Sequence, residues 1–283
     1  MTPETAAQVL SKRTKAVIVV HLAGWPADMT ALMAFAATQN LKVIEDCAQA
    51  HGASELGRPV GGIGHIGCFS FCQDKIISTG GEGGMVVTSD ITLYKKMWAT
   101  RDHGKDFDRA TTKSMAAESG PHFKWMVDSF GTNARMTEAQ AAIGRLQLKK
   151  LPQWRAQRQA NAAALTAALR GSNAVTVPQP DAQHVHAYYK FYALVTPGAL
   201  KSGWSRDRIC AELQRRGVPA GSGACPDISR EAAFASFGAQ APHPGAAEIA
   251  ERTLMLPVHP TLTRGNVAFM AETVRQILNE AAR

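Results

Sequence analysis

The first half of the chain alternates between short apolar runs and stretches with helical spacing. Residues 16–22 (AVIVVHL) and 42–46 (KVIED) are rich in β-branched side chains, which is typical of strands buried on both faces of a sheet. Between them, apolar positions recur at helical spacing from about residue 26 to Gln39. Two more short strands are expected at 66–71 and 84–88. Strand–helix–strand order with short connections predicts a mostly parallel sheet covered by helices.

The second half begins with a long helical segment, residues 137–169. Thr137 and Gln140 resemble a capping box at its start. Pro152 predicts a kink or a break inside it, because proline removes a backbone hydrogen bond. We expect this segment to connect a large domain to a small one.

Shorter elements are expected after this helix. A strand is predicted at 188–195, a helix at 205–216 with a serine cap and a glycine stop, and a closing helix at 266–283. We therefore divide the chain into a large sheet domain, residues 1–150, and a small α+β domain, residues 151–283.

The composition is that of a globular protein and narrows the classes of partner. No window reaches the roughly 18 apolar residues of a membrane helix, and the start of the chain lacks the plan of a secretory signal. A cytoplasmic protein without a membrane partner is expected. The net charge of +8 would suit anionic metabolites or nucleic acid. Since the basic residues are dispersed and not interleaved with aromatic ones, nucleic-acid binding is disfavoured.

The cysteines argue against both a disulfide framework and a metal site. There are five of them, an odd and scattered set. Cys68 and Cys72, even with His65, lack a fourth ligand at a spacing that completes a tetrahedral site. We expect Cys68 and Cys72 to be small core residues, and no bound metal.

The residues with candidate catalytic chemistry lie at the end of one predicted strand and in the loop after another. Asp46 ends the strand 42–46, and Lys75 follows the strand 66–71, just before the glycine-rich run 79–84. Ligands of parallel sheets gather beyond the carboxyl ends of strands. A lysine that forms a Schiff base and a carboxylate that pairs with a pyridine nitrogen are what pyridoxal 5'-phosphate (PLP) chemistry requires.

Four blocks of sequence, in order, carry a resemblance to a known family. They are EDCAQAHGA (45–53), GCFSF (67–71) with Lys75 and the glycine run, GTNARMTEAQAAIG (131–144) and LPVHPTLT (256–263). Together they resemble the DegT/StrS family of PLP-dependent sugar aminotransferases. The resemblance implies the fold of the aspartate aminotransferase type (fold type I), an α/β architecture with a mostly parallel sheet and a small C-terminal domain.

The resemblance also implies a role for each matched residue. Lys75 would hold PLP and move the proton, and Asp46 would pair with the pyridinium. Gln49 would lie near the ring oxygen, and Ser70 would bind the phosphate. Asn133 would reach the phosphate of the neighbouring subunit's cofactor, which implies a homodimer with shared active sites. Without the resemblance, each residue has an ordinary structural interpretation, such as a solvated lysine or a turn aspartate.

Other residues with suggestive chemistry stay outside the predicted catalytic set. His51 and His103 are interpreted as structural hydrogen-bonding residues, because Lys75 already covers the proton transfer. The glycine run 79–84 lacks the spacing of a nucleotide fingerprint. We interpret it as a tight turn between the lysine loop and the next strand.

The resemblance predicts the reaction, and it also predicts weak cofactor binding. Amino transfer from an amino acid, glutamate above all, to a keto group of a nucleotide-linked sugar is expected. Lys75 disfavours the family's dehydratase branch, and a cyclic, non-nucleotide keto substrate stays open.

The family's N-terminal phosphate-binding and ring-stacking region has no counterpart here, so we expect weaker PLP binding and exposed sheet edges. The alternative is a truncated, weak or inactive paralogue that acts as a subunit or binding module with a full-length partner.

Overall fold

The computed structural model describes residues 1–112, 125–223, 227–237 and 243–283. By its internal contacts the chain divides into two compact units. Unit 1 comprises residues 1–22 and 26–150, and unit 2 comprises residues 23–25 and 151–283. Each unit has its own sheet and its own apolar core.

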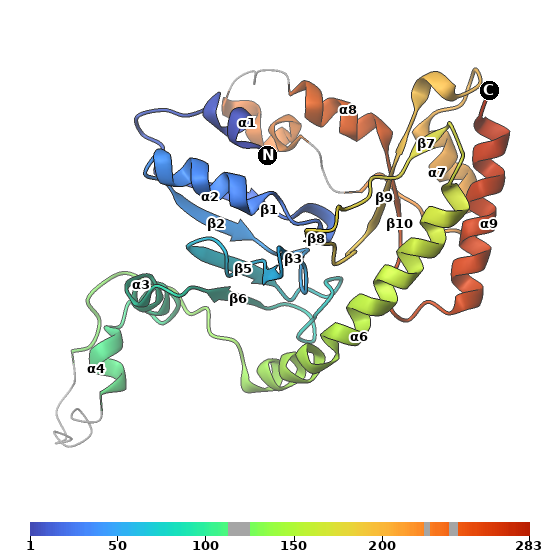
Figure 1. Ribbon diagram of the computed structural model, residues 1–283. Helices are drawn as coiled ribbons and strands as arrows, with labels where there is room; N and C mark the ends of the chain where they lie inside the picture. The colour runs from blue at the N-terminus through green and yellow to red at the C-terminus, as the bar shows by residue number, and fades with distance from the viewer. Residues whose placement is uncertain (113–124, 224–226, 238–242) are drawn as a thin grey trace. The chain divides into compact units, whose positions relative to one another are not determined.

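Unit 1 is built on a four-stranded sheet with the strand order β1-β2-β5-β6 (Figure 1). Its strands are β1 (Ala16–Val20), β2 (Lys42–Asp46), β5 (Ile66–Ser70) and β6 (Gly84–Val87). The first three are parallel to one another, and β6 runs antiparallel to β5. The predicted mostly parallel sheet is therefore observed.

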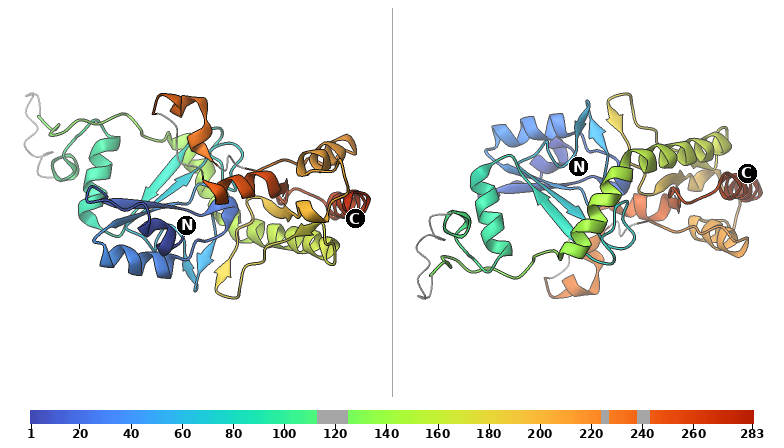
Figure 2. Two further views of the ribbon diagram at one scale, coloured as in Figure 1. Left: turned by 90° about the horizontal axis from the view of Figure 1, so that it is seen from above. Right: turned by 90° about the horizontal axis from the view of Figure 1, so that it is seen from below.

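Helix α2 (Met29–Thr38) covers one face of this sheet (Figures 1 and 2). It begins where the Asp28 side chain accepts a hydrogen bond from the Ala31 N–H at 2.9 Å, as in an N-cap. Met29 and Leu32 of α2 are fully buried with Val19 and Val43 of the sheet. Alternate residues of a strand point to opposite faces. The other side chains of β1 therefore face away from α2.

The strands β1 and β6 are the outer strands of this sheet among the described residues. Ile18 and Val20 on β1, and Met85 and Val86 on β6, are each about half exposed. The apolar surface expected at the sheet edges is present at these four side chains. Unpaired edges with apolar side chains are surfaces that proteins commonly cover.

Unit 1 also contains shorter elements. Strands β3 (Ser54–Glu55) and β4 (Arg58–Pro59) form an antiparallel hairpin, which the sequence did not predict. Its further helices are α1 (Pro3–Ala7), α3 (Ile91–Arg101) and α4 (Phe107–Thr111). The 3-10 turn η1 (Leu22–Gly24) begins in unit 1, and its other two residues belong to unit 2.

The long helix α6 (Glu138–Leu169) is observed where it was expected. Its capping box is confirmed, because Thr137 N–H donates to Gln140 Oε1 at 3.1 Å and Gln140 N–H donates to Thr137 Oγ1 at 3.3 Å. The helix continues through Pro152 without a break. A single proline removes one hydrogen bond, and side chains that are fixed on both sides of it preserve the helix. Gln140 and Leu165 are examples, the first bonded to Glu82 and the second fully buried.

Unit 2 contains a three-stranded antiparallel sheet in the order β10-β9-β7. Its strands are β7 (Val175–Thr176), β9 (Phe191–Val195) and β10 (Thr253–Leu256), and the short strand β8 (His184–Val185) is not part of this sheet. The predicted strand 188–195 starts later, at Phe191, because Tyr188 has a positive φ of 49°. Positive φ is incompatible with extended strand geometry.

Unit 2 also contains helical elements that follow α6 in the chain. They are α7 (Arg206–Arg215), α8 (Pro244–Arg252), α9 (Arg264–Ala281), and the 3-10 turns η2 (Pro197–Ala199), η3 (Ile228–Arg230) and η4 (Ala232–Phe237). The predicted Ser205 cap is confirmed by a 3.2 Å bond from Arg208 N–H, and Gly217 follows the helix with φ 81°. Among the residues that the structure describes, every helix is too short or too polar to cross a lipid bilayer.

Candidate active site

The register of unit 1 brings two of the predicted cofactor residues to one face of the sheet. Asp46 is the last residue of β2 and lies opposite Cys68 of β5. Ser70 is two residues after Cys68, so its side chain points to the same face as those of Cys68 and Asp46. Both Asp46 and Ser70 are half-buried. They lie at the carboxyl ends of neighbouring parallel strands, where ligands of such sheets gather.

Local hydrogen bonds orient both side chains. Asp46 Oδ1 accepts a bond from Ala48 N–H at 2.9 Å. Ser70 Oγ accepts a bond from Cys72 N–H at 3.3 Å. A carboxylate has a second oxygen, and a hydroxyl that accepts one bond still carries a proton to donate. Asp46 therefore keeps its second carboxylate oxygen, and Ser70 keeps its hydroxyl proton, for contacts with a ligand.

Lys75 lies in the loop that connects β5 to β6. Its N–H donates to the Cys72 carbonyl at 3.1 Å, and its side chain is 17% exposed, with Nζ 3.7 Å from Asp74 Oδ1. The loop is closed at its base, where Phe71 N–H donates to the Gly83 carbonyl at 2.7 Å. This arrangement places Lys75 directly beyond the strand end that carries Ser70.

The lysine loop is anchored on both sides of its turn. Ile76 and Ile77 are buried immediately after Lys75. Ser78 N–H donates to Gln147 Oε1 of α6 at 2.9 Å. The predicted role of the glycine run is confirmed, since Gly80 and Gly81 have φ values of 84° and 142°, which L-residues rarely adopt.

Gln49 and Asn133 have different positions in unit 1. Gln49 is half-buried in the turn after Asp46, which Ala50 N–H closes by donating to the Cys47 carbonyl at 2.9 Å. Asn133 is exposed, and its backbone forms an isolated antiparallel bridge with Asp102 after α3. The structure thus brings four predicted residues to the ends of β2 and β5, and it places Asn133 on a separate segment.

Glu45 and His21 are residues that the sequence analysis did not single out. Glu45 is fully buried, and its Oε1 accepts bonds from Ile63 N–H at 2.8 Å and Gly64 N–H at 2.5 Å. Its Oε2 accepts one from Gly61 N–H at 2.7 Å and contacts His21 Nε2 at 3.1 Å. A glutamate directly after the apolar residues Val43 and Ile44, in a strand expected to be buried, was the available signal.

The charge of Glu45 is stabilised by these bonds. Burial pushes the pKa of this carboxyl upward, but the hydrogen bonds from His21 and from three backbone N–H groups outweigh it. The pKa of Glu45 therefore lies below its ordinary value. Glu45 is a buried, ionised residue directly before Asp46.

His21, Glu45 and Cys47 form a buried cluster whose donor atoms lie within 4.8 Å of one another. The chemistry of these donors does not suit a metal ion. Burial raises the pKa of the Cys47 thiol, and the charges of Glu45 and Asp46 raise it further. Metal ligation requires a thiolate. Because both Glu45 oxygens already accept bonds from the protein, we interpret the cluster as structural.

His51 packs near aromatic rings, whereas Cys68 and Cys72 are partly exposed. His51 is buried, and its ring lies 5.5 Å from that of Phe69 and 5.8 Å from that of Phe71. Cys68 and Cys72 are only half-buried, so the expectation that both are core residues was wrong. Cys68 faces the same side of the sheet as Asp46, the face that α2 does not cover.

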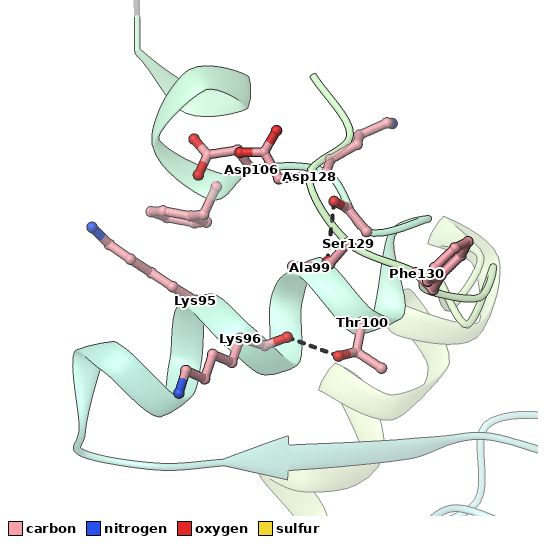
Figure 3. Close-up of a pocket in the computed structure, with 11 residues that line it drawn as sticks. Lys95, Lys96, Ala99, Thr100, Asp106, Asp128, Ser129 and Phe130 are labelled. Atoms are coloured by element: carbon pink, nitrogen blue, oxygen red, sulfur yellow. Dashed lines mark hydrogen bonds between the residues drawn. The ribbon is translucent and has the colours of Figure 1, made fainter. Parts of the chain in front are cut away.

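A cavity of about 420 Å³ lies beside α3, away from the predicted residues. Figure 3 shows Lys95, Lys96 and Thr100 on α3 and Asp128, Ser129 and Phe130 on the neighbouring segment. Charged groups around it pair with each other. Lys95 Nζ lies 2.6 Å from Asp108, and Arg109 forms a close ion pair with Asp128. None of the four residues at the ends of β2 and β5 lines this cavity.

Comparison with known proteins gives the family. Residues 1–275 match the DegT/DnrJ/EryC1/StrS aminotransferase family. The chain belongs to this family. The resemblance seen in the sequence blocks is therefore confirmed.

Two relatives of this DegT/DnrJ/EryC1/StrS member are named as enzymes of nucleotide-linked sugars. The UDP-N-acetyl-3-dehydro-alpha-D-glucosamine 3-aminotransferase of Acidithiobacillus ferrooxidans is 34% identical over 273 residues, which are 95% of this chain and 66% of the relative. The dTDP-3-amino-3,4,6-trideoxy-alpha-D-glucose transaminase of Streptomyces venezuelae is 30% identical over 97% of this chain and 66% of its own. The chain thus spans about two thirds of the length of these relatives.

Solved structures agree with the fold. An aminotransferase from Psychrobacter cryohalolentis has a TM-score of 0.94 and 46% identity, over 99% of this chain and 72% of its own. DesV from S. venezuelae, solved with a ketimine intermediate, has a TM-score of 0.84 and 29% identity, over 98% and 69%. The predicted fold class, a PLP-dependent transferase of fold type I, is confirmed.

Aminotransferases of this family depend on PLP, and the residues present here fit that cofactor. A primary amine on a glycine-flanked loop, a carboxylate at a strand end and a hydroxyl on the adjacent strand lie at one end of the sheet. These are groups that can hold an aldehyde, a protonated ring nitrogen and a phosphate. The donor set therefore fits PLP, and Lys75, Asp46 and Ser70 are the residues that would hold it.

Proposed function

We propose that this chain carries the catalytic lysine of a PLP-dependent aminotransferase. Its reaction would transfer an amino group, from glutamate as the expected donor, to a keto group of a nucleotide-linked sugar. The product would enter the synthesis of amino sugars, polysaccharides or secondary metabolites. One observation carries the proposal: a chain of this family has Lys75 on the loop that follows β5, beyond the paired strand ends of Asp46 and Ser70.

The residues have distinct roles in this proposal. When bound, PLP supplies an electron-withdrawing ring that stabilises negative charge at the carbon next to the amino group. Lys75 holds the cofactor covalently and then accepts and returns the proton at Nζ. Asp46 would keep the ring nitrogen protonated through its carboxylate, Gln49 would lie near the ring oxygen, and Ser70 Oγ would bind the phosphate.

An amination assay tests the reaction. The purified chain is incubated with PLP, glutamate and a UDP- or dTDP-linked 3-keto sugar, the substrate type suggested by the names of the relatives. We expect 2-oxoglutarate and the amino sugar in equal amounts by mass spectrometry. Cofactor binding without amino sugar from these or from cyclic keto substrates would contradict the reaction. Failure to bind PLP at all would favour the alternative of a subunit that needs a full-length partner.

We also propose a homodimer in which Asn133 serves the active site of the neighbouring subunit. Asn133 is exposed on a segment separate from Lys75 and Asp46, which suits a contact with a second chain. Exposed apolar side chains near it, Val127 and Phe130, would be covered in such a dimer.

Mixing two inactive variants tests the shared site. Lys75→Ala and Asn133→Ala are each expected to lose activity. A mixed dimer contains one doubly altered site and one intact site, so mixing should restore activity to a substantial fraction of the parent's. Inactive mixtures, despite mixed dimers seen by native mass spectrometry, would show that Asn133 acts within its own subunit, and full activity of Asn133→Ala alone would show that it does not act at all.

A further inference from the structure

We propose that His21 and Glu45 are positioning residues that hold Asp46 in place for the cofactor ring. The inference rests on the proposed function, since it concerns the carboxylate that would pair with PLP. It assigns a role to a buried histidine–glutamate pair for which the proposed reaction has no direct use.

His21 binds both residues at the end of β2. Its backbone N–H donates to the carbonyl oxygen of Asp46 at 3.1 Å. Its Nε2 lies 3.1 Å from the carboxylate of Glu45. One residue after β1 therefore fixes the last two residues of the neighbouring strand, through its main chain and its ring at once.

The ring of His21 has a fixed tautomer. Ala27 N–H donates to His21 Nδ1 at 3.0 Å, and a backbone N–H can only be a donor. Nδ1 must therefore carry the lone pair and Nε2 the proton, which His21 donates to Glu45. A proton on Nδ1 would break the bond from Ala27, so the neutral form with Nε2–H fits both contacts.

Glu45 also binds the segment that precedes the neighbouring strand β5. Its two oxygens bind the N–H groups of Gly61, Ile63 and Gly64, in the segment that leads into β5. Any Cβ at Gly67 of β5 would clash with the backbone of Gly61, so this segment packs directly on the strand. The Glu45 carboxylate thus connects the strand end that carries Asp46 to the segment that packs on β5.

The pair also has an electrostatic consequence. Asp46 directly follows an ionised, fully buried Glu45. The Glu45 side chain points to the opposite face of β2 from Asp46, and a negative charge in the adjoining residue favours protonation of a ring nitrogen that pairs with Asp46. We therefore expect Glu45 to affect the protonation of the bound cofactor as well as the position of Asp46.

The test compares Glu45→Gln with the matched control Glu55→Gln. Glu55 is also a buried glutamate of unit 1, and its carboxylate binds Thr30 and Arg58. Amide exchange of Ala48, whose N–H is bound by Asp46, reports the position of that carboxylate without any cofactor. We expect about 10-fold faster exchange in Glu45→Gln and no change in the control, because a lost bond to a charged group is worth about tenfold or more.

Cofactor binding gives a second measurement. Glu45→Gln should weaken PLP binding by about 10- to 100-fold and shift the pH midpoint of the visible spectrum of the loaded chain, while Glu55→Gln should change neither. Unchanged Ala48 exchange, or an unchanged affinity and pH midpoint, in the folded Glu45→Gln chain would overturn the positioning role. If the unaltered chain binds no PLP, the proposed function fails, and the Ala48 exchange still decides the inference.

The unaltered chain provides a check that does not depend on folding of a variant. Nitrogen NMR of the His21 ring should show a protonated Nε2 and an unprotonated Nδ1. A proton on Nδ1 would contradict the arrangement.

Discussion

Replacing Lys75 by alanine is expected to remove the visible absorption band that the parent chain gains with PLP, and to abolish amino transfer. Lys75 supplies the side-chain amine in the loop after Ser70, next to the strand that ends at Asp46. Its loss removes both the covalent link and the proton carrier. Proton transfer alone contributes about 10²- to 10⁴-fold to the rate, so activity should fall at least that far.

Lys95→Ala is the matched control for this experiment. Lys95 lies on α3 and forms an ion pair with Asp108, so its removal should leave the spectrum unchanged. Lys75→Arg keeps the positive charge but not the nucleophile, and should behave like Lys75→Ala. A band that persists in Lys75→Ala would mean that PLP binds elsewhere, and would contradict the assignment of Lys75.

The second large effect is on stability and concerns the core of unit 2. Phe191 is the first residue of the central strand β9 and is 1% exposed. It packs with Leu165 of α6, Leu213 of α7 and Ile277 of α9, among others. Phe191→Ala should lower the free energy of unfolding by about 3–5 kcal/mol, through lost burial and a residual cavity. Chemical denaturation measures this change.

Phe269→Ala is the control, because Phe269 lies on α9 but is 54% exposed. It should change the free energy of unfolding by less than about 1 kcal/mol. Comparable losses in both variants would contradict the assignment of Phe191 to the core.

The same variant tests the proposed division into domains 1–150 and 151–283. If the two fold independently, hydrogen exchange in Phe191→Ala should become faster in residues 151–283 and stay slow in β2 and β5. Equal acceleration in both parts would mean that the chain unfolds as one cooperative body, and would count against two domains.

The local elements could be predicted from the sequence because their causes are local. The strand 42–46 was predicted with its observed bounds, and the capping box of α6 follows from Thr137 and Gln140, three residues apart. Lys75 and Asp46 were found as candidates because their sequence blocks resemble a family that the chain indeed belongs to. Pro152 shows the limit of local reasoning, since contacts on both sides of it keep α6 continuous.

The tertiary structure alone decided which side chains meet. That Asp46 and Ser70 share a face depends on the pairing of Asp46 with Cys68, and the pattern of apolar residues does not specify that register to the residue. The bonds of Glu45 to His21 and to Gly61 join positions 16 to 24 residues apart, and no periodicity encodes such contacts. The sequence therefore determined the chemistry that the chain can offer. Long-range backbone pairing and burial decided where each group lies and which partner fixes it.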